Sequence, residues 1–129
     1  MRNIDMEIVI SEYIETALWL ETDNSDESGG EPFNVNYSVD DINGESRDKM
    51  ASDMQAFVDG CIEHRPDVFG GIEDRMIGRD FWLTRCGHGV GFWDRGLGEI
   101  GDWLTSMAKP YGDASLYLGD DEKIHYFNS

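Results

Sequence analysis

The chain has 129 residues, enough for one domain with a modest hydrophobic core. Its formal net charge is −17 and its pI is about 4.2, which argues against direct binding to nucleic acid or to an anionic membrane. Two cysteines are too few for a secreted domain held by disulfides, so we expect free thiols and a cytoplasmic protein.

The first predicted helix spans residues 8–21, where Ile10, Ile14 and Leu18 recur at helical spacing. Acidic residues interrupt this N-terminal segment, so it reads as neither a signal peptide nor a membrane span. Residues 22–44 form a polar loop within the domain, rich in Asp, Ser and Gly. The start of this loop is a poor calcium-binding match, because Ser28 and Asn34 replace the required glycine and glutamate.

A second helix is predicted over residues 45–64, where Met50, Met54, Phe57 and Cys61 form one apolar stripe. Its opposite face is acidic, and we expect that face to be exposed to solvent. Residues 71–78 predict no more than a short helical turn.

A hairpin is predicted next, with strands at residues 81–84 and 90–93 around a glycine-rich turn. A third helix follows between Leu97 and Tyr111, where apolar residues again recur at helical spacing. The chain then predicts two more strands, at residues 115–119 and 123–127, separated by a polar turn.

This order of elements predicts an α+β protein with a single domain over residues 1–129. Two N-terminal helices would pack on a four-stranded, mostly antiparallel sheet with the order β-β-α-β-β.

Residues 80–102 contain the pattern G-x-G-x-x-G at Gly96, Gly98 and Gly101, which is typical of dinucleotide-binding loops. Too little chain follows Gly101 to complete a doubly wound sheet, so we expect no cofactor. The aromatic pairs at residues 81–82 and 92–93 are better explained as core residues, including both Trp82 and Trp93.

The same region contains candidate residues for two further kinds of site. Cys86, His88 and Asp94 could supply a nucleophile, a base and a residue that orients the base. Cys61, His64, Cys86 and His88 could supply four zinc ligands, but Cys-x-His is tighter than the usual ligand pairs. A buried free thiol explains Cys61 without a metal, so we expect no metal site.

The same region carries a resemblance. DFWLTR, then one residue, then GHG-x-GFWDRG-x-G resembles a family of small acidic proteins of bacteriophages and prophages, whose function is undefined. The segments LETD, GEPFNVNYSVDDI and LYLGDD are also similar to that family, so the resemblance covers most of the chain. It implies a viral source and a host-cell setting. The family more often has asparagine where Cys86 stands, which argues against a role for that thiol.

These observations favour a protein that binds another protein, with nucleic-acid mimicry as one form of such binding. Carboxylates on a rigid face can replace phosphates in the basic groove of a host DNA-handling or defence protein. The candidate binding residues are Glu12, Glu15, Asp48, Asp53 and Asp59.

Two alternatives remain open. A small enzyme or ligand binder would use the glycine-rich region, with His88, Asp94 and Arg95 as its site. A binder of another kind would expose an apolar patch that includes Tyr126 and Phe127.

Overall fold

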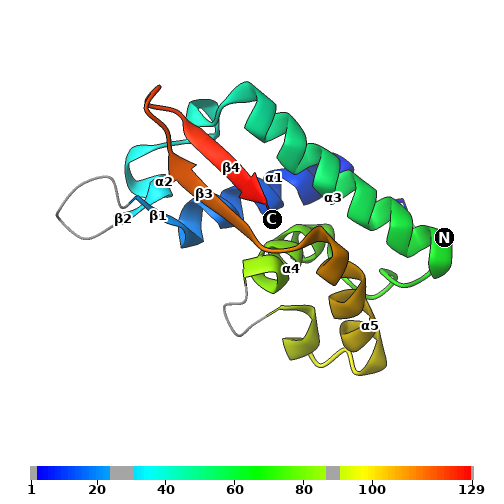
Figure 1. Ribbon diagram of the computed structural model, residues 1–129. Helices are drawn as coiled ribbons and strands as arrows, with labels where there is room; N and C mark the ends of the chain where they lie inside the picture. Colours follow the sequence, from blue (N-terminus) through cyan, green and yellow to red (C-terminus); the bar gives the residue numbers. More distant parts are fainter. Residues whose placement is uncertain (1–2, 24–30, 87–90, 129) are drawn as a thin grey trace.

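The computed structural model of the protein describes residues 3–23, 31–86 and 91–128, and this part of the chain is mostly helical (Figure 1). The helices are α1 (Met6–Leu20), α2 (Phe33–Asn36), α3 (Gly44–His64), α4 (Asp74–Cys86) and α5 (Glu99–Ala108). Single 3-10 turns are η1 (Val39–Asp41), η2 (Phe92–Asp94) and η3 (Lys109–Tyr111). The strands are β1 (Thr22–Asp23), β2 (Glu31–Pro32), β3 (Ala114–Leu118) and β4 (Ile124–Asn128).

The four-stranded sheet that we predicted is wrong. The described strands form two separate antiparallel pairs, β1 with β2 and β3 with β4. Residues 81–84, predicted as a strand, lie inside helix α4, and Phe92 lies in η2 instead of a return strand. Trp93 of that expected return strand also lies in η2, and Val90 lies outside the described residues. The protein is therefore a helical domain with a C-terminal hairpin.

Helix α4 forms because its packing overrides the local preference of its aromatic residues for strands. Ile77, Phe81 and Arg85 recur every four residues and are all buried. Gly78 allows α4 to lie close against α1, since a Cβ atom there would come 2.2 Å from the carbonyl oxygen of Val9. The β-propensity of single residues depends strongly on context, so tertiary contacts of this kind decide the local structure.

The other predicted helices are confirmed within a few residues. Asp5 caps α1, because its side chain accepts hydrogen bonds from the backbone N–H groups of Glu7 and Ile8. Asn43 caps α3 through the N–H of Ser46. The third predicted helix is present as α5 and continues into η3, which contains Pro110.

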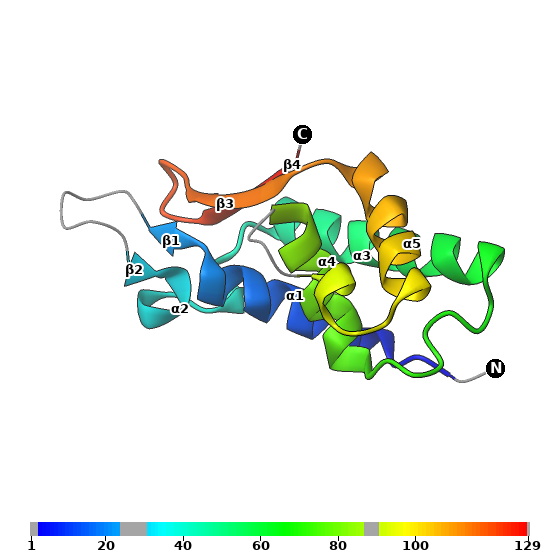
Figure 2. The same ribbon diagram turned by 90° about the horizontal axis from the view of Figure 1, so that it is seen from below.

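The C-terminal hairpin is also confirmed, with Tyr117 opposite His125 and Leu118 opposite Ile124. Figures 1 and 2 show it alongside the N-terminal half of α3, while α5 lies at the other end of the molecule beside α4. Asn43 fixes this arrangement by donating its N–H to the carbonyl oxygen of Ile124.

Stacked aromatic rings fill the centre of the core. The Phe57 ring lies 4.2 Å from that of Phe81, which in turn lies 5.2 Å from that of Tyr13. Trp82 is fully buried, as predicted, but Trp93 is 39% exposed, so its predicted place in the core is wrong. Within the described ranges, no helix is both long and apolar enough to cross a membrane.

Candidate functional site

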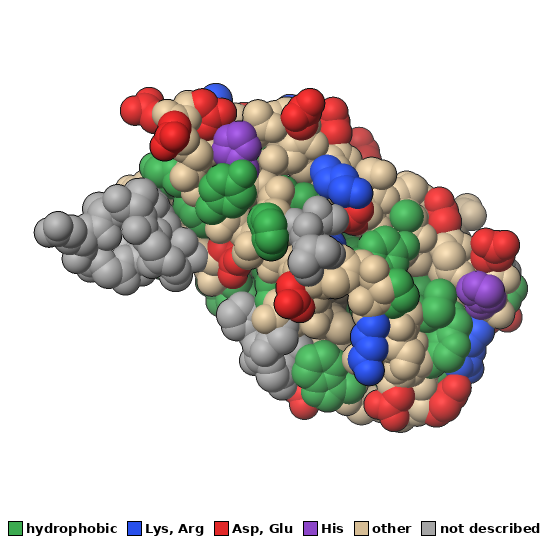
Figure 3. All heavy atoms as spheres, viewed as in Figure 1, with side chains coloured by type: hydrophobic (Ala, Val, Ile, Leu, Met, Phe, Trp, Pro, Cys, Tyr) green, Lys and Arg blue, Asp and Glu red, His purple; other side chains and the backbone are tan. Residues whose placement is uncertain are grey.

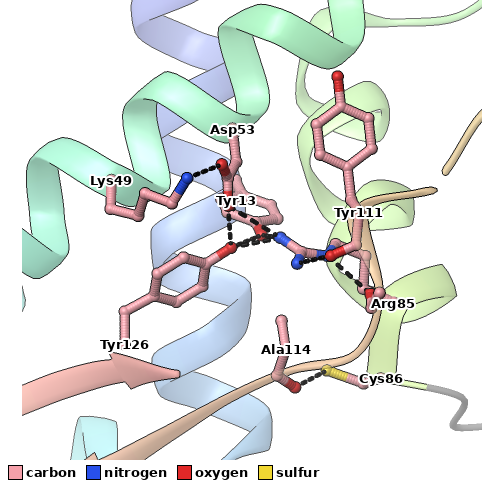
Figure 4. Close-up of polar contacts among 9 residues, drawn as sticks. Tyr13, Lys49, Asp53, Arg85, Cys86, Tyr111, Ala114 and Tyr126 are labelled. Carbon is pink, nitrogen blue, oxygen red and sulfur yellow. Dashed lines mark hydrogen bonds and ion pairs between the residues drawn. The ribbon is translucent and has the colours of Figure 1, made fainter. Parts of the chain in front are cut away.

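A buried network of polar groups surrounds Arg85, whose side chain is 0% exposed near the end of α4 (Figure 4). Its guanidinium group donates to the backbone carbonyl oxygens of Tyr111, at 2.6 Å, and Gly112, at 3.1 Å. It also donates to the hydroxyl of Tyr13 at 2.9 Å and lies 3.3 Å from Asp53 Oδ2. One arginine thus links helices α1, α3 and α4 to the segment before the hairpin.

Tyr126 closes the network from strand β4. Its hydroxyl accepts a hydrogen bond from Arg85, donates to Asp53 Oδ2 at 2.8 Å, and lies 2.9 Å from the hydroxyl of Tyr13. Lys49 contacts the other carboxylate oxygen of Asp53 at 3.1 Å (Figure 4). The carboxylate therefore lies between two cations, which offsets the cost of burying its charge.

The pKa values of the network indicate a structural role. Burial raises the pKa of Tyr13 to about 12 and also raises that of Tyr126. Burial by itself lowers the pKa of Arg85, but the oxygens of Tyr13, Tyr126 and Asp53 outweigh it and the net shift is upward. The tyrosines thus keep their protons and the arginine its charge at neutral pH. General acid–base catalysis needs a pKa near the working pH, which these groups lack.

The sequence reasoning missed this network, although its residues carried a signal. Arg85 follows Ile77 and Phe81 at helical spacing and therefore lies on the buried face of α4. A guanidinium group buried there requires hydrogen-bond acceptors in the core. Asp53 was predicted to lie on an exposed helix face, and that prediction is wrong, because the residue is only 5% exposed. It lies on the same side of α3 as the buried Met50 and Phe57.

The alternative site predicted at His88, Asp94 and Arg95 falls only partly within the described residues. His88 lies outside the described residues, and Asp94 is exposed on η2. The Arg95 guanidinium binds Asp80 of α4 through Nε and Nη2, at 2.8–3.1 Å. These hydrogen bonds raise the pKa of Arg95. They also attach the segment after η2 to helix α4.

A pocket of about 300 Å³ lies between the end of α4, η2 and the end of α5. Its lining consists of Thr84, Arg85, Trp93, Thr105, Ala108, Lys109, Gly112 and Asp113. The Thr84 hydroxyl accepts from the N–H of Phe92, and the Thr105 hydroxyl donates to the carbonyl oxygen of Gly101. Both threonine hydroxyls are thus engaged with backbone groups of the same region.

The two cysteines are poor candidates for chemistry. Burial raises the pKa of Cys61 to about 12. Burial also raises the pKa of Cys86, whose Sγ donates to the carbonyl oxygen of Ala114 at 3.4 Å. Only the thiolate is a good nucleophile or metal ligand. In the part of the chain that the structure describes, no three His, Cys, Asp or Glu side chains are grouped to hold a metal.

The remaining predicted binding residues are carboxylates on two helices. Asp48 and Asp59 are exposed on α3, and Glu15 is exposed on α1. Glu12 is half-buried and pairs with Arg79 of α4 at 2.9 Å. Glu12 therefore also serves the contact between α1 and α4.

Helix α3 presents its exposed carboxylates as one line, which we call the α3 acidic stripe. It consists of Glu45, Asp48, Asp59 and Glu63, all exposed to solvent. At about 100° per residue these four positions fall within a sector of about 60°, and they span about 27 Å of the helix axis. Figure 3 shows acidic side chains along the outer edge of the molecule where α3 runs. Among the described residues, none of the four carboxylates has a cation within ion-pairing distance.

No protein-family model matches this chain, and no curated protein or solved structure matches it significantly.

Proposed function

We propose that this protein acts by binding a protein partner with a basic surface, and that the α3 acidic stripe is the contact. The partner is a nucleic-acid-binding protein, and the carboxylates of the stripe occupy the places of phosphates in its groove. The single observation that carries the proposal is the alignment, along a rigid helix, of carboxylates that form no ion pair with any described residue.

The distribution of positive charge supports this interpretation. Most cations of the chain are held in ion pairs within the molecule: Lys49, Arg65, Arg75, Arg79, Arg85 and Arg95. They neutralise carboxylates elsewhere and leave the stripe uncompensated. A strongly negative surface of this kind attracts a basic partner over a long range and repels nucleic acid.

The position of the stripe on α3 gives a second argument. Asp59 and Glu63 lie four residues apart near the C-terminus of the helix, where the helix dipole disfavours negative charge. Like charges at this spacing also destabilise a helix by a few tenths of a kcal/mol. Asp59 accepts a hydrogen bond from Gln55 at 3.0 Å, but among the described residues no cation pairs with either carboxylate, which favours a role in binding.

The resemblance to a phage and prophage family supplies the setting for the proposal. A protein made inside an infected bacterium meets host enzymes that bind DNA through basic grooves. We therefore infer that the partner is a DNA-handling or defence protein of the host cytoplasm.

The proposal is tested by capture from a bacterial lysate with a stripe variant and a charge-matched control. The stripe variant carries Glu45→Gln, Asp48→Asn, Asp59→Asn and Glu63→Gln. The control carries Glu7→Gln, Asp40→Asn, Asp67→Asn and Asp102→Asn, which remove the same charge at exposed positions of other elements.

We expect the wild type and the control to retain DNA-binding proteins that are released by high salt and by added duplex DNA, and the stripe variant to lose them. Equal capture by the stripe variant and the control would contradict the proposal. Capture that resists salt and DNA would point instead to an apolar interface.

A further inference from the structure

The outer face of the C-terminal hairpin carries aromatic side chains that nothing in the described structure covers. Tyr117 is 51% and Phe127 is 53% exposed. Residues alternate between the two faces of a strand, so Tyr117 and Phe127 share this face with His125. The opposite face, with Leu116 and Ile124, is buried in the core.

Contacts within the hairpin hold this aromatic face in place. The rings of Tyr117 and His125 stack with their centroids 5.3 Å apart. His125 Nε2 lies 2.9 Å from Asp121 Oδ1, which also accepts a hydrogen bond from the N–H of Lys123. The face is thus ordered before any partner arrives, which reduces the entropy lost on binding.

Carboxylates flank this aromatic face on two sides. The turn between β3 and β4 carries Asp120, Asp121 and Glu122, all exposed. On the other side, the N-terminal end of α3 adjoins β4, because the hydroxyl of Ser46 accepts from the N–H of Tyr126 at 2.9 Å. Glu45 of the α3 acidic stripe immediately precedes Ser46 in the chain. In Figure 3, hydrophobic side chains cover the hairpin and acidic side chains gather at its turn.

We propose that this hairpin face, with Tyr117, His125 and Phe127 at its centre, binds an arginine-bearing segment of a partner protein. The inference rests on the proposed function in one respect, namely that the partner is basic. The inference adds a second contact surface to the α3 acidic stripe, and it identifies guanidinium as the group that this second surface recognises.

The combination of aromatic rings and carboxylates selects arginine over lysine. A guanidinium group is planar, stacks on aromatic faces, and pairs with carboxylates through two parallel hydrogen bonds. The protein contains such an arrangement itself: the Arg65 guanidinium lies 5.1 Å from the ring centroid of Trp103 and pairs with Glu99 at 2.6 Å. The hairpin face offers the same two kinds of partner without an arginine of its own chain.

The charges of the hairpin argue against a second copy of this chain as the occupant. Two copies meeting face to face would bring two acidic turns together, and each chain carries a formal charge of −17. Repulsion between like charges at an interface opposes such a pairing.

The test measures the binding of two synthetic peptides of equal length and charge, one containing arginine and glycine and the other lysine and glycine. Binding is followed by fluorescence anisotropy, with the full chain as wild type, hairpin variant and α3 stripe variant. The hairpin variant is Tyr117→Thr with Phe127→Thr, which keeps the β-propensity of the strands. Ile8→Gln, at an exposed apolar position of α1, is its control.

We expect the wild type to prefer the arginine peptide about two- to fivefold for each guanidinium stacked on an exposed ring. The hairpin variant should lose this preference, and Ile8→Gln should keep it. The α3 stripe variant should bind both peptides more weakly but retain the preference for arginine. Equal affinity of the wild type for both peptides overturns the inference and leaves the proposed function standing. An unaffected α3 stripe variant beside an impaired hairpin variant overturns the proposed function instead.

Amide chemical shifts of the wild type supply a second measurement that does not depend on a folded variant. Addition of the arginine peptide should shift the amide signals of β3 and β4 more than those of α5. Shifts of the same hairpin amides with protein concentration, in the absence of peptide, would mean that a second copy occupies the face and would overturn the inference.

Discussion

The guanidinium group of Arg85 lies 3.3 Å from the carboxylate of Asp53 in the interior of the protein, and the two side chains come from different helices. The two residues are 32 positions apart in the sequence. The pair thereby ties α4 to α3, and Tyr126 attaches the hairpin to both.

Removal of Arg85 should destabilise the protein strongly. In Arg85→Met the Asp53 carboxylate keeps Lys49 but loses its buried partner, so we expect the free energy of unfolding to fall by about 3–5 kcal/mol. Urea denaturation measures the change. Arg75→Gln is the control, because Arg75 and Glu73 form an exposed pair and its loss should cost less than about 1 kcal/mol. Equal losses for the two variants would show that the network contributes little.

Alkaline pH should weaken the protein through Tyr13. Burial raises the pKa of Tyr13 from its ordinary value of 10.0 to about 12. Between these values the unfolded chain loses the phenol proton while the folded protein keeps it, so stability is complete below pH 10 and falls as the pH rises to 12. Urea denaturation at several pH values measures this fall. The dependence should be shallower in Tyr13→Phe, and an equally steep fall in that variant would contradict the assignment.

Both thiols should react slowly in the folded protein. The pKa of Cys61 is raised to about 12 and that of Cys86 is also raised, so almost no thiolate is present at neutral pH. Alkylation followed by mass spectrometry should label neither residue quickly until denaturant is added. Rapid labelling of Cys86 alone in the native protein would indicate a reactive site and revive the catalytic alternative.

The sequence predicted the helices whose apolar residues recur at regular spacing, namely α1, α3 and α5, and it also predicted the C-terminal hairpin. It failed for residues 81–84 and 92–93, where aromatic residues beside a glycine-rich segment imitate a hairpin. Ile77, Phe81 and Arg85 are spaced as on one face of a helix. Because arginine is not apolar, however, the three residues do not form the apolar pattern by which a buried helix face is recognised. The partners that make Arg85 a core residue, among them Asp53, Tyr13 and Tyr126, lie far away in the sequence.

The candidate surface was predicted in part for the same reason. Charge and helical spacing were enough to place Asp48 and Asp59 on the exposed side of α3. Helical spacing also places Asp53 on the side of Met50 and Phe57. Its charge nevertheless favoured exposure, because Arg85 and Tyr126, which offset the cost of burying it, lie far away in the sequence. A carboxylate at an exposed helical position and one at a buried position look alike until the partner of the buried one is known.

The two helical glycines Gly78 and Gly60 should respond in opposite ways to alanine. At Gly78 a Cβ atom would lie 2.2 Å from the carbonyl oxygen of Val9 and 2.9 Å from the backbone nitrogen of Tyr13, so α1 and α4 would have to separate. We expect Gly78→Ala to reduce the free energy of unfolding by about 1–3 kcal/mol, as other overpacked cores do.

At Gly60, inside α3, a Cβ atom would meet no other atom within 4 Å. Gly60→Ala should therefore stabilise the protein by about 0.5–1 kcal/mol, because alanine loses less backbone entropy in a helix than glycine. Thermal and urea denaturation of both variants, side by side, measure the difference. If Gly78→Ala were as stable as Gly60→Ala, the backbones of α1 and α4 could not lie as close as the structure places them, and the core between Tyr13 and Phe81 would have to be packed differently.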